Sequence, residues 1–375
     1  MNLKDIVHLR LVNQRIVGSG FEKPAEVVRW MGAMQAQDYP AALWGVGLRT
    51  KDAQIADVEQ AIVNREIVRT WPMRGTLHFV PAEDIRWMLK LMTPRIISGM
   101  ASRHRSLDLN EEIFAKSRKI LVREMEGGKI LTRGEMREVL ERANISAEGQ
   151  RGNHIFGVLA QEGLLCFGPH RGKPHSAKAT RGKQPTFVLL DEWIAPSKDL
   201  EREEALAKLA KTYFSSHGPA TLQDFVWWTG LKVSDARIGI ALLGSKFSQE
   251  TIEGNVYWML KGLPDLPAGR QALSPTAYLL PAFEEYMLGY RDRSAALEAA
   301  HAQRVVPGGN GIFFPIIVID GQIIGTWKKM VKKDSLFITL SPFRTLKISE
   351  KKALEIAAEQ YGTFIGFPVH LLYQV

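Results

Sequence analysis

The chain has 375 residues, a length that suggests about two or three structural units rather than one core. No apolar run approaches the roughly 20 residues that span a bilayer, and the first residues lack the apolar core of a signal peptide, so the sequence predicts a cytoplasmic protein. The formal net charge of +9 and the isoelectric point near 9.5 favour a polyanionic partner such as nucleic acid.

Three consecutive stretches of the chain follow one plan, in which helices lead into a β-hairpin. In the first, Pro24 suits the first turn of an apolar helix, and Gln35-Ala36-Gln37-Asp38 ends that helix before Tyr39-Pro40. Apolar spacing predicts the other elements of this stretch: a helix over 9–16, a helix over 55–63, strands at 67–70 and 76–80, and a turn around Pro72 and Gly75.

The second and third stretches repeat the plan, each with a capping signal at the start of a short helix. Thr132 with Glu135 has the pattern of a capping box, and Thr221 with Asp224 resembles it. The second stretch is expected to contain helices over 110–125, 133–142 and 152–163 and strands at 164–167 and 186–190. The third is expected to contain helices over 199–216, 225–229 and 234–243 and strands at 247–252 and 256–260 around Gly254-Asn255. Their spacing is too irregular for a solenoid and fits three divergent copies of one small domain.

The remainder of the chain differs from these copies. A linker rich in Pro and Gly is expected over 260–275, followed by strands at 313–319, 322–327 and 336–340 and a closing helix over 350–361. Asp320-Gly321 is a strong hairpin signal between the first two of these strands. The sequence therefore predicts an α+β fold of four domains, at 1–108, 109–196, 197–262 and 263–375, the last a small β-rich barrel or sheet.

The tip of the second hairpin is the strongest nucleic-acid signal. Between Pro169 and Pro185 there is no acidic residue. The tip carries five cations and two histidines: Arg171, Lys173, Lys178, Arg181, Lys183, His170 and His175. Such a tip can follow a phosphate backbone, whereas a solvated loop without a partner is the alternative. Two further basic groups have the same two interpretations: Arg95, Arg103, His104 and Arg105, and Lys328, Lys329, Lys332 and Lys333.

The sequence gives no signal of a disulfide, a metal site or a phosphate-binding loop. Cys166 is the only cysteine, which excludes an intrachain disulfide and a thiolate metal cluster, and no metal-binding spacing of histidines is present. Gly308-Gly309-Asn310-Gly311 precedes a strand and lacks the helix that a phosphate-binding loop requires. No cofactor or metal is expected. The tryptophans Trp71, Trp227 and Trp228 are expected in the core.

Five short motifs, in this order along nearly the whole chain, resemble the AlkZ/YcaQ family of winged-helix DNA glycosylases. They are Met34-Gln35-Ala36-Gln37-Asp38, Arg74-Gly75-Thr76-Leu77-His78, His217-Gly218-Pro219-Ala220-Thr221, Leu280–Tyr286 with Gly289–Arg293, and Asp320-Gly321 with Gly325-Thr326-Trp327. The resemblance implies three tandem winged-helix units and a C-terminal β-barrel that together bind DNA. With the basic groups, it adds Arg74, His78, Arg291 and Arg293 to the DNA-binding residues.

The resemblance also implies an activity, the excision of bulky alkylated purines such as N7-alkylguanine and, in some members, the unhooking of interstrand crosslinks. The motif it implies as catalytic is Gln-x-Gln, matched by Gln35 and Gln37. Glu284 stands where the family pattern has Asp in an Asp-Glu pair, which leaves the role of that position open.

Elementary chemistry is consistent with this activity. An amide is not an effective general base near neutral pH, but an N7-alkylated purine is already cationic and departs as a neutral base. Amide oxygens of Gln35 and Gln37 then need only to orient a water at C1′. Asp38 has two open roles: it either stabilises the sugar cation or accepts a proton, or it caps the helix that follows.

Two other functions use the same features. A regulator could bind DNA with these hairpins and no chemistry, although no heptad segment for dimerisation is present. A protein–protein scaffold is the third possibility. The interpretation favoured by the motifs is a monofunctional DNA glycosylase, a monomer in the cytoplasm that associates with the nucleoid when it acts on alkylated or crosslinked double-stranded DNA.

Overall fold

The computed structural model describes residues 1–18, 20–172, 184–262, 275–309 and 311–374, which form two compact units. One unit contains residues 1–58 and 206–375, and the other contains most of residues 59–205. The predicted linker lies largely outside the described residues. None of the helices within the described ranges has both the length and the apolar character of a bilayer-spanning helix.

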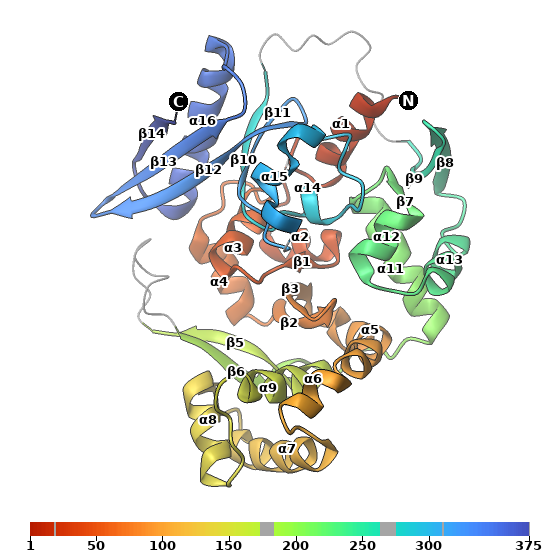
Figure 1. The fold of residues 1–375 in the computed structure, drawn as a ribbon, viewed down its shortest axis with the longest axis vertical. Coiled ribbons are helices and arrows are strands. Elements are labelled where there is room, and N and C mark those ends of the chain that lie inside the picture. Colours follow the sequence, from red (N-terminus) through yellow and green to blue (C-terminus); the bar gives the residue numbers. More distant parts are fainter. Residues whose placement is uncertain (19, 173–183, 263–274, 310, 375) are drawn as a thin grey trace. The chain divides into compact units, whose positions relative to one another are not determined.

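The first unit begins with a helical segment (Figure 1). Its elements are α1 (Leu3–Asn13), α2 (Pro24–Met31), β1 (Met34–Gln35), α3 (Tyr39–Gly47) and the start of α4 (Ile55–Val63). Pro24 occupies the first turn of α2, as predicted. The prediction that Gln35 ends this helix is wrong. Gly32, with a φ of 77°, stops α2 after Met31, and the chain becomes extended before Gln35.

The second unit contains one sheet and the helices that pack on it. Its elements are β2 (Ile67–Met73), β3 (Thr76–Pro81), α5 (Ile85–Gly99), α6 (Ala101–Ser106), α7 (Glu111–Met125), β4 (Leu131–Thr132), α8 (Arg133–Arg142), α9 (Arg151–Gln161), β5 (Leu165–Arg171), β6 (Gln184–Leu189) and α10 (Leu190–Trp193). Its strands run in the order β3-β2-β5-β6-β4. Arg69 pairs with Phe167, so the first two predicted hairpins share one sheet. The capping box at Thr132 is present and starts α8.

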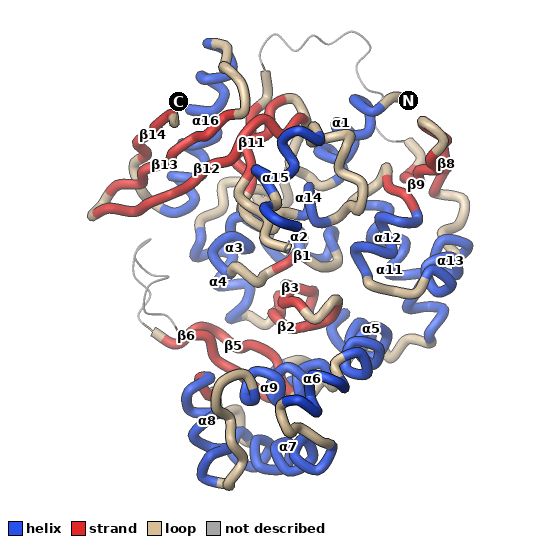
Figure 2. Tube along the Cα trace, viewed as in Figure 1, coloured by secondary structure: helices blue, strands red, loops and turns tan. Residues whose placement is uncertain are grey.

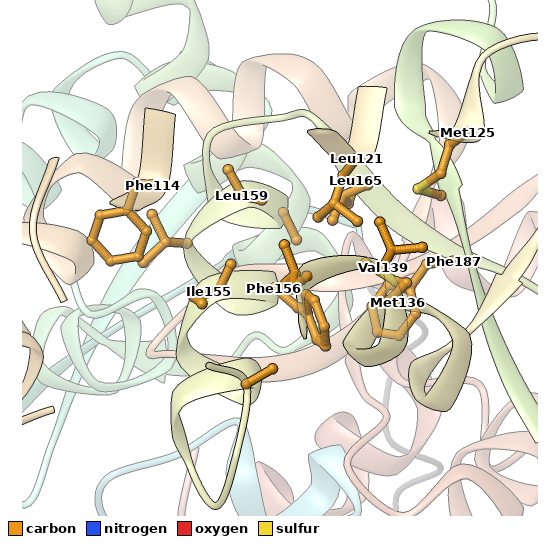
Figure 3. Packing of buried hydrophobic residues seen from close by; sticks show 14 of the residues in the cluster. Phe114, Leu121, Met125, Met136, Val139, Ile155, Phe156, Leu159, Leu165 and Phe187 are labelled. Carbon is orange, nitrogen blue, oxygen red and sulfur yellow. The ribbon is translucent and has the colours of Figure 1, made fainter. Parts of the chain in front are cut away.

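The core of this unit lies between α7, α8, α9 and the β5–β6 hairpin (Figure 3). Phe114 and Leu121 from α7 and Phe156 from α9 meet Phe187 of β6 in one cluster of buried side chains. Trp71 packs against that cluster with its ring nearly parallel to Phe187. The base of the basic hairpin is therefore a packed scaffold, while residues 173–183, most of the predicted tip, lie outside the described residues.

The first unit continues after residue 205 with helices and two further sheets (Figure 2). The elements up to residue 260 are α11 (Arg202–Ser216), β7 (Ala220–Thr221), α12 (Leu222–Thr229), α13 (Val233–Ala241), β8 (Phe247–Ile252) and β9 (Asn255–Leu260). Those after residue 275 are β10 (Ala277–Leu280), α14 (Glu285–Leu288), α15 (Ala302–Val305), β11 (Ile316–Ile319), β12 (Gln322–Lys332), β13 (Ser335–Pro342), α16 (Ile348–Ile365) and β14 (Val369–Tyr373). The sheets have the orders β7-β9-β8 and β10-β11-β12-β13-β14.

The mixed α+β class is confirmed, but the predicted C-terminal barrel is wrong for the described residues. Their five C-terminal strands form an open sheet with β10 and β14 at opposite edges. The reason lies in the last connection. β14 pairs in parallel with β13, and α16 makes the crossover between them and packs against β10. A helix on the face of the sheet occupies the space into which the strands would curl to close a barrel.

Candidate active site

Gln35 and Gln37 are the accessible side chains of a short segment that begins as the strand β1 and bends at Gln37. Met34 and Ala36 are buried, Gln35 is half-buried and Gln37 is exposed. The segment therefore leaves the two amides more accessible than the apolar side chains beside them.

Asp38 directly follows this segment and caps α3. Its Oδ1 accepts a hydrogen bond from the Ala41 backbone N–H at 3.1 Å, and Pro40 occupies the first turn. Asp38 itself remains exposed. The capping alternative for this residue is thus confirmed, and the cap fixes the point at which the glutamine segment ends.

A carboxylate from a distant part of the chain anchors the glutamine segment. Glu285 Oε1 accepts the backbone N–H of Gln35 at 2.9 Å, and Oε2 accepts the indole N–H of Trp228 at 3.0 Å. Glu285 is only 1% exposed. Because Glu285 starts α14 and Trp228 lies on α12, three separate elements of the first unit meet under Gln35.

The neighbouring carboxylate, Glu284, has a different partner. Its Oε1 lies 2.6 Å from Arg49 Nη2, in a buried ion pair. Arg49 also donates to the Gln14 and Gly45 backbone carbonyls at 2.7 and 2.8 Å. Glu284 therefore takes part in a buried ion pair.

A second ion pair extends this buried polar network. Arg10 Nη2 lies 3.7 Å from Asp224 Oδ2, and Arg10 Nε donates to the Pro219 carbonyl at 3.0 Å. Asp224 completes the predicted cap with Thr221 and also accepts the Arg291 backbone N–H at 2.9 Å. Asp224 therefore connects the start of α12 to the segment that follows α14.

Ser216, His217 and Glu285 have the residue types of a hydrolytic triad, but their geometry excludes that role. Ser216 Oγ lies 2.8 Å from His217 Nδ1, and His217 Nε2 lies 3.5 Å from Glu285 Oε2. All three are buried, and Ser216 Oγ donates to the Thr212 carbonyl. A nucleophile has to reach its substrate. Burial lowers the pKa of His217 despite the opposing effect of Glu285, so a neutral imidazole stacked on Tyr213 is the stable form at neutral pH.

The predicted DNA-binding residues are divided between the two units. Arg291 and Arg293 belong to the first unit. Arg291 Nη1 donates to Gln223 Oε1 at 3.0 Å, and Arg293 lies over the rings of Trp227 and Phe313. The expectation that Trp227 is a core residue is wrong, because its side chain is 42% exposed next to this guanidinium, whereas Trp228 is buried as predicted.

In the second unit the predicted cations have identifiable local partners. Arg74 Nη2 lies 3.3 Å from His78 Nε2, and His78 Nδ1 lies 2.9 Å from the Thr76 carbonyl. Arg171 pairs with Glu135 at 2.5 Å and donates to the Ile130 carbonyl. The exposed arginines of α5 and α6 are Arg95, Arg103 and Arg105, and Arg103 donates to Gln150. The four remaining predicted cations, Lys173, Lys178, Arg181 and Lys183, lie outside the described residues.

A comparison with known protein families identifies the family of this chain. A family model described as DNA glycosylase AlkZ-like matches residues 28–364. The chain belongs to the AlkZ-like DNA glycosylase family. The expected family resemblance is thereby confirmed, and the chain is assigned to the DNA glycosylases.

Two comparisons show how far the similarity to the AlkZ-like family extends. An interstrand DNA cross-link repair glycosylase of Streptomyces sahachiroi is 26% identical over 352 residues, which cover 89% of this chain and 90% of that protein. The solved structure of the Streptomyces sahachiroi DNA glycosylase AlkZ matches with a TM-score of 0.79 at 24% identity, over 99% of this chain and 100% of that one. The chain therefore shares its fold with an AlkZ structure over nearly its full length.

Proposed function

We propose that the chain hydrolyses the N-glycosidic bond of cationic alkylated purines of the N7-alkylguanine type in double-stranded DNA. The observation that carries this proposal is that Gln35 and Gln37 are the accessible side chains of a segment whose backbone Glu285 anchors at Gln35. The related Streptomyces protein is named for the repair of interstrand cross-links, which supports crosslinked duplexes as further substrates.

In the proposed mechanism the two amides only orient a water. An alkylated N7 gives the purine a positive charge, so the base leaves as a neutral molecule and needs no proton from the enzyme. The amide oxygens of Gln35 and Gln37 accept hydrogen bonds from one water and hold it at C1′, where the sugar develops oxocarbenium character. Orienting a nucleophile in this way converts a bimolecular step into an effectively unimolecular one.

The same chemistry supports a monofunctional enzyme. A glycosylase that also breaks the strand forms a covalent Schiff base between an amine and C1′, and an amide nitrogen does not form one. Water is then the nucleophile, and the product is an abasic site in an intact strand.

Product analysis on a duplex with one 7-methylguanine tests the proposal. We expect release of the free base and a strand that breaks only after heating in alkali. A matched duplex with hypoxanthine, a neutral purine, is expected to stay unchanged because its base is a poor leaving group without protonation. Strand breakage without alkali would contradict the monofunctional mechanism, and equal release of hypoxanthine would contradict selection by charge.

Asp38 is proposed to add electrostatic stabilisation of the sugar cation to its capping role. Asn caps a helix as well as Asp does, so Asp38→Asn should leave the melting temperature unchanged. Loss of the charge should lower the single-turnover rate roughly tenfold, since a carboxylate several ångströms from a cation contributes about 1 to 2 kcal/mol in a partly solvated site. Asp38→Ala should show the same rate loss and in addition lose about 1 kcal/mol of stability. An unchanged rate for Asp38→Asn would leave Asp38 as a cap alone.

The element order supports three winged-helix units. The series helix, short strand, helix, helix, strand, strand occurs as α2-β1-α3-α4-β2-β3, as α7-β4-α8-α9-β5-β6 and as α11-β7-α12-α13-β8-β9. The sheets β4-β6-β5 and β7-β9-β8 also share their strand order. We therefore propose domains at 1–108, 109–196 and 197–262 as divergent winged helices, followed by a β-rich domain at 263–375.

The cations on these units are proposed to bind the DNA backbone. The residues are Arg74, His78, Arg95, Arg103, Arg105, Arg171, Lys173, Lys178, Arg181, Lys183, Arg291 and Arg293. Replacing the five basic residues of the hairpin tip, from Arg171 to Lys183, by Ala should weaken duplex binding and flatten its dependence on salt. Each lost phosphate contact should reduce the slope of log affinity against log salt by about 0.9.

The matched control removes charge elsewhere in the second unit. Lys116 and Lys119 are exposed on α7, and Lys116→Ala/Lys119→Ala should leave the slope unchanged. An unchanged slope for the tip variant as well would place the DNA path on other cations.

A further inference from the structure

The Glu285 carboxylate contacts the backbone of Gln35 and can influence the reaction through that contact. We infer that Glu285 is a positioning residue for the Gln-x-Gln segment, in that its carboxylate sets the backbone position from which Gln35 and Gln37 orient the attacking water. This inference rests on the proposed function and extends it to a side chain outside the motif.

The contacts of Glu285 require a carboxylate. Oε1 accepts the Gln35 backbone N–H and Oε2 accepts the Trp228 indole N–H, at 2.9 and 3.0 Å. Both partners are donors only, and an ionised carboxylate is a side chain that accepts on both of its oxygens. An amide in its place would direct an NH₂ group at one of the two donors. At 1% exposure, neither donor would find a water in exchange.

The segment that Glu285 contacts is short. β1 is only two residues long, and α2 ends at Met31, before the segment begins. The bond from Gln35 to Glu285 joins positions 250 residues apart in sequence. Because Gln37 lies only two residues further along the chain, a shift of the Gln35 backbone moves both amides. A displacement of about 1 Å is enough to lose much of the advantage of an oriented nucleophile.

The element that carries Glu285 is itself fixed on several sides. Glu284 pairs with Arg49, Tyr286 donates its hydroxyl to the Gly321 carbonyl at 2.7 Å, and Tyr213 donates to the Gly289 carbonyl at 2.7 Å. Trp228 contacts Glu285 from α12. Reactive groups are held most accurately by supporting side chains whose own positions are locked by hydrogen bonds, and Glu285 meets that condition.

Single-turnover kinetics on the 7-methylguanine duplex test the inference in the full-length protein. Glu285→Gln is expected to lower the rate at saturating enzyme ~10-fold with unchanged affinity for the duplex. Glu350→Gln is the control, since it alters another buried carboxylate, which contacts Arg344 rather than Gln35, and it should leave the single-turnover rate unchanged.

A second measurement does not depend on activity. With selective ¹⁵N-glutamine labelling, the backbone amide proton of Gln35 should resonate downfield, as expected for a donor to a carboxylate, and should move upfield and exchange faster in Glu285→Gln but not in Glu350→Gln. An unmoved Gln35 resonance would overturn the inference. So would an unchanged single-turnover rate in Glu285→Gln. A wild-type protein that releases no base, with the Gln35 resonance shifted as expected, would instead contradict the proposed function.

Discussion

Gln37→Ala is expected to lower the single-turnover release of 7-methylguanine by ~10²-fold or more, while duplex affinity and melting temperature stay close to those of the wild type. Gln37 is the exposed member of the pair. Its truncation removes an oriented acceptor for the water and opens no cavity. The rate, the affinity and the melting temperature should be measured on the same preparations.

Gln60→Ala provides a matched control for this variant. Gln60 lies on α4 and bonds Asn64 at the surface, so its loss removes an amide of the same size without any effect on release. Parallel loss of duplex affinity and activity in Gln37→Ala would make Gln37 a binding residue. Loss of melting temperature would make it a structural one.

Arg49→Met is expected to destabilise the first unit by about 3 to 5 kcal/mol, the usual cost of leaving one partner of a buried ion pair uncompensated. Arg49 is fully buried and its guanidinium satisfies Glu284 and the carbonyls of Gln14 and Gly45. Without it, a carboxylate and two carbonyls lose their donors in a site that excludes water. The free energy of unfolding in urea is the quantity to measure.

The double variant Arg49→Met/Glu284→Leu is the informative comparison. It removes both charges, so part of the lost stability should return, although the two carbonyls still lack a donor. A loss of less than about 1 kcal/mol for Arg49→Met would contradict the role assigned to this ion pair.

Local signals in the sequence were sufficient for many elements of the fold. Thr132 and Thr221 both form the predicted caps, the helix over 55–63 is present with those bounds, and Asp320-Gly321 makes the predicted turn with φ values of 49° and 81°. Each of these features depends on residues within a few positions of one another. The sequence did not decide between a barrel and an open sheet at residues 263–375, because the open sheet depends on the parallel pairing of β14, the last strand, with β13 across the whole of α16.

Only part of the candidate site could be predicted from the sequence. The glutamines stand out as a motif, but apolar spacing extended α2 into them because the stop at Gly32 is a matter of one backbone angle. The anchor was missed because Glu285 and Gln35 meet only in the folded chain. A signal was present nonetheless: Glu284 and Glu285 lie between Phe283 and Tyr286, and carboxylates enclosed by aromatic residues indicate burial with a dedicated partner.

The proposed reaction is cleavage of a glycosidic bond by a water that Gln35 and Gln37 orient. Single-turnover release of 7-methylguanine from a duplex, with wild type beside Gln35→Ala/Gln37→Ala, tests it most directly. We expect release by the wild type well above spontaneous depurination and near-background release by the double variant, at equal duplex affinity. Equal release by both proteins would contradict the assignment of catalysis to the Gln-x-Gln segment.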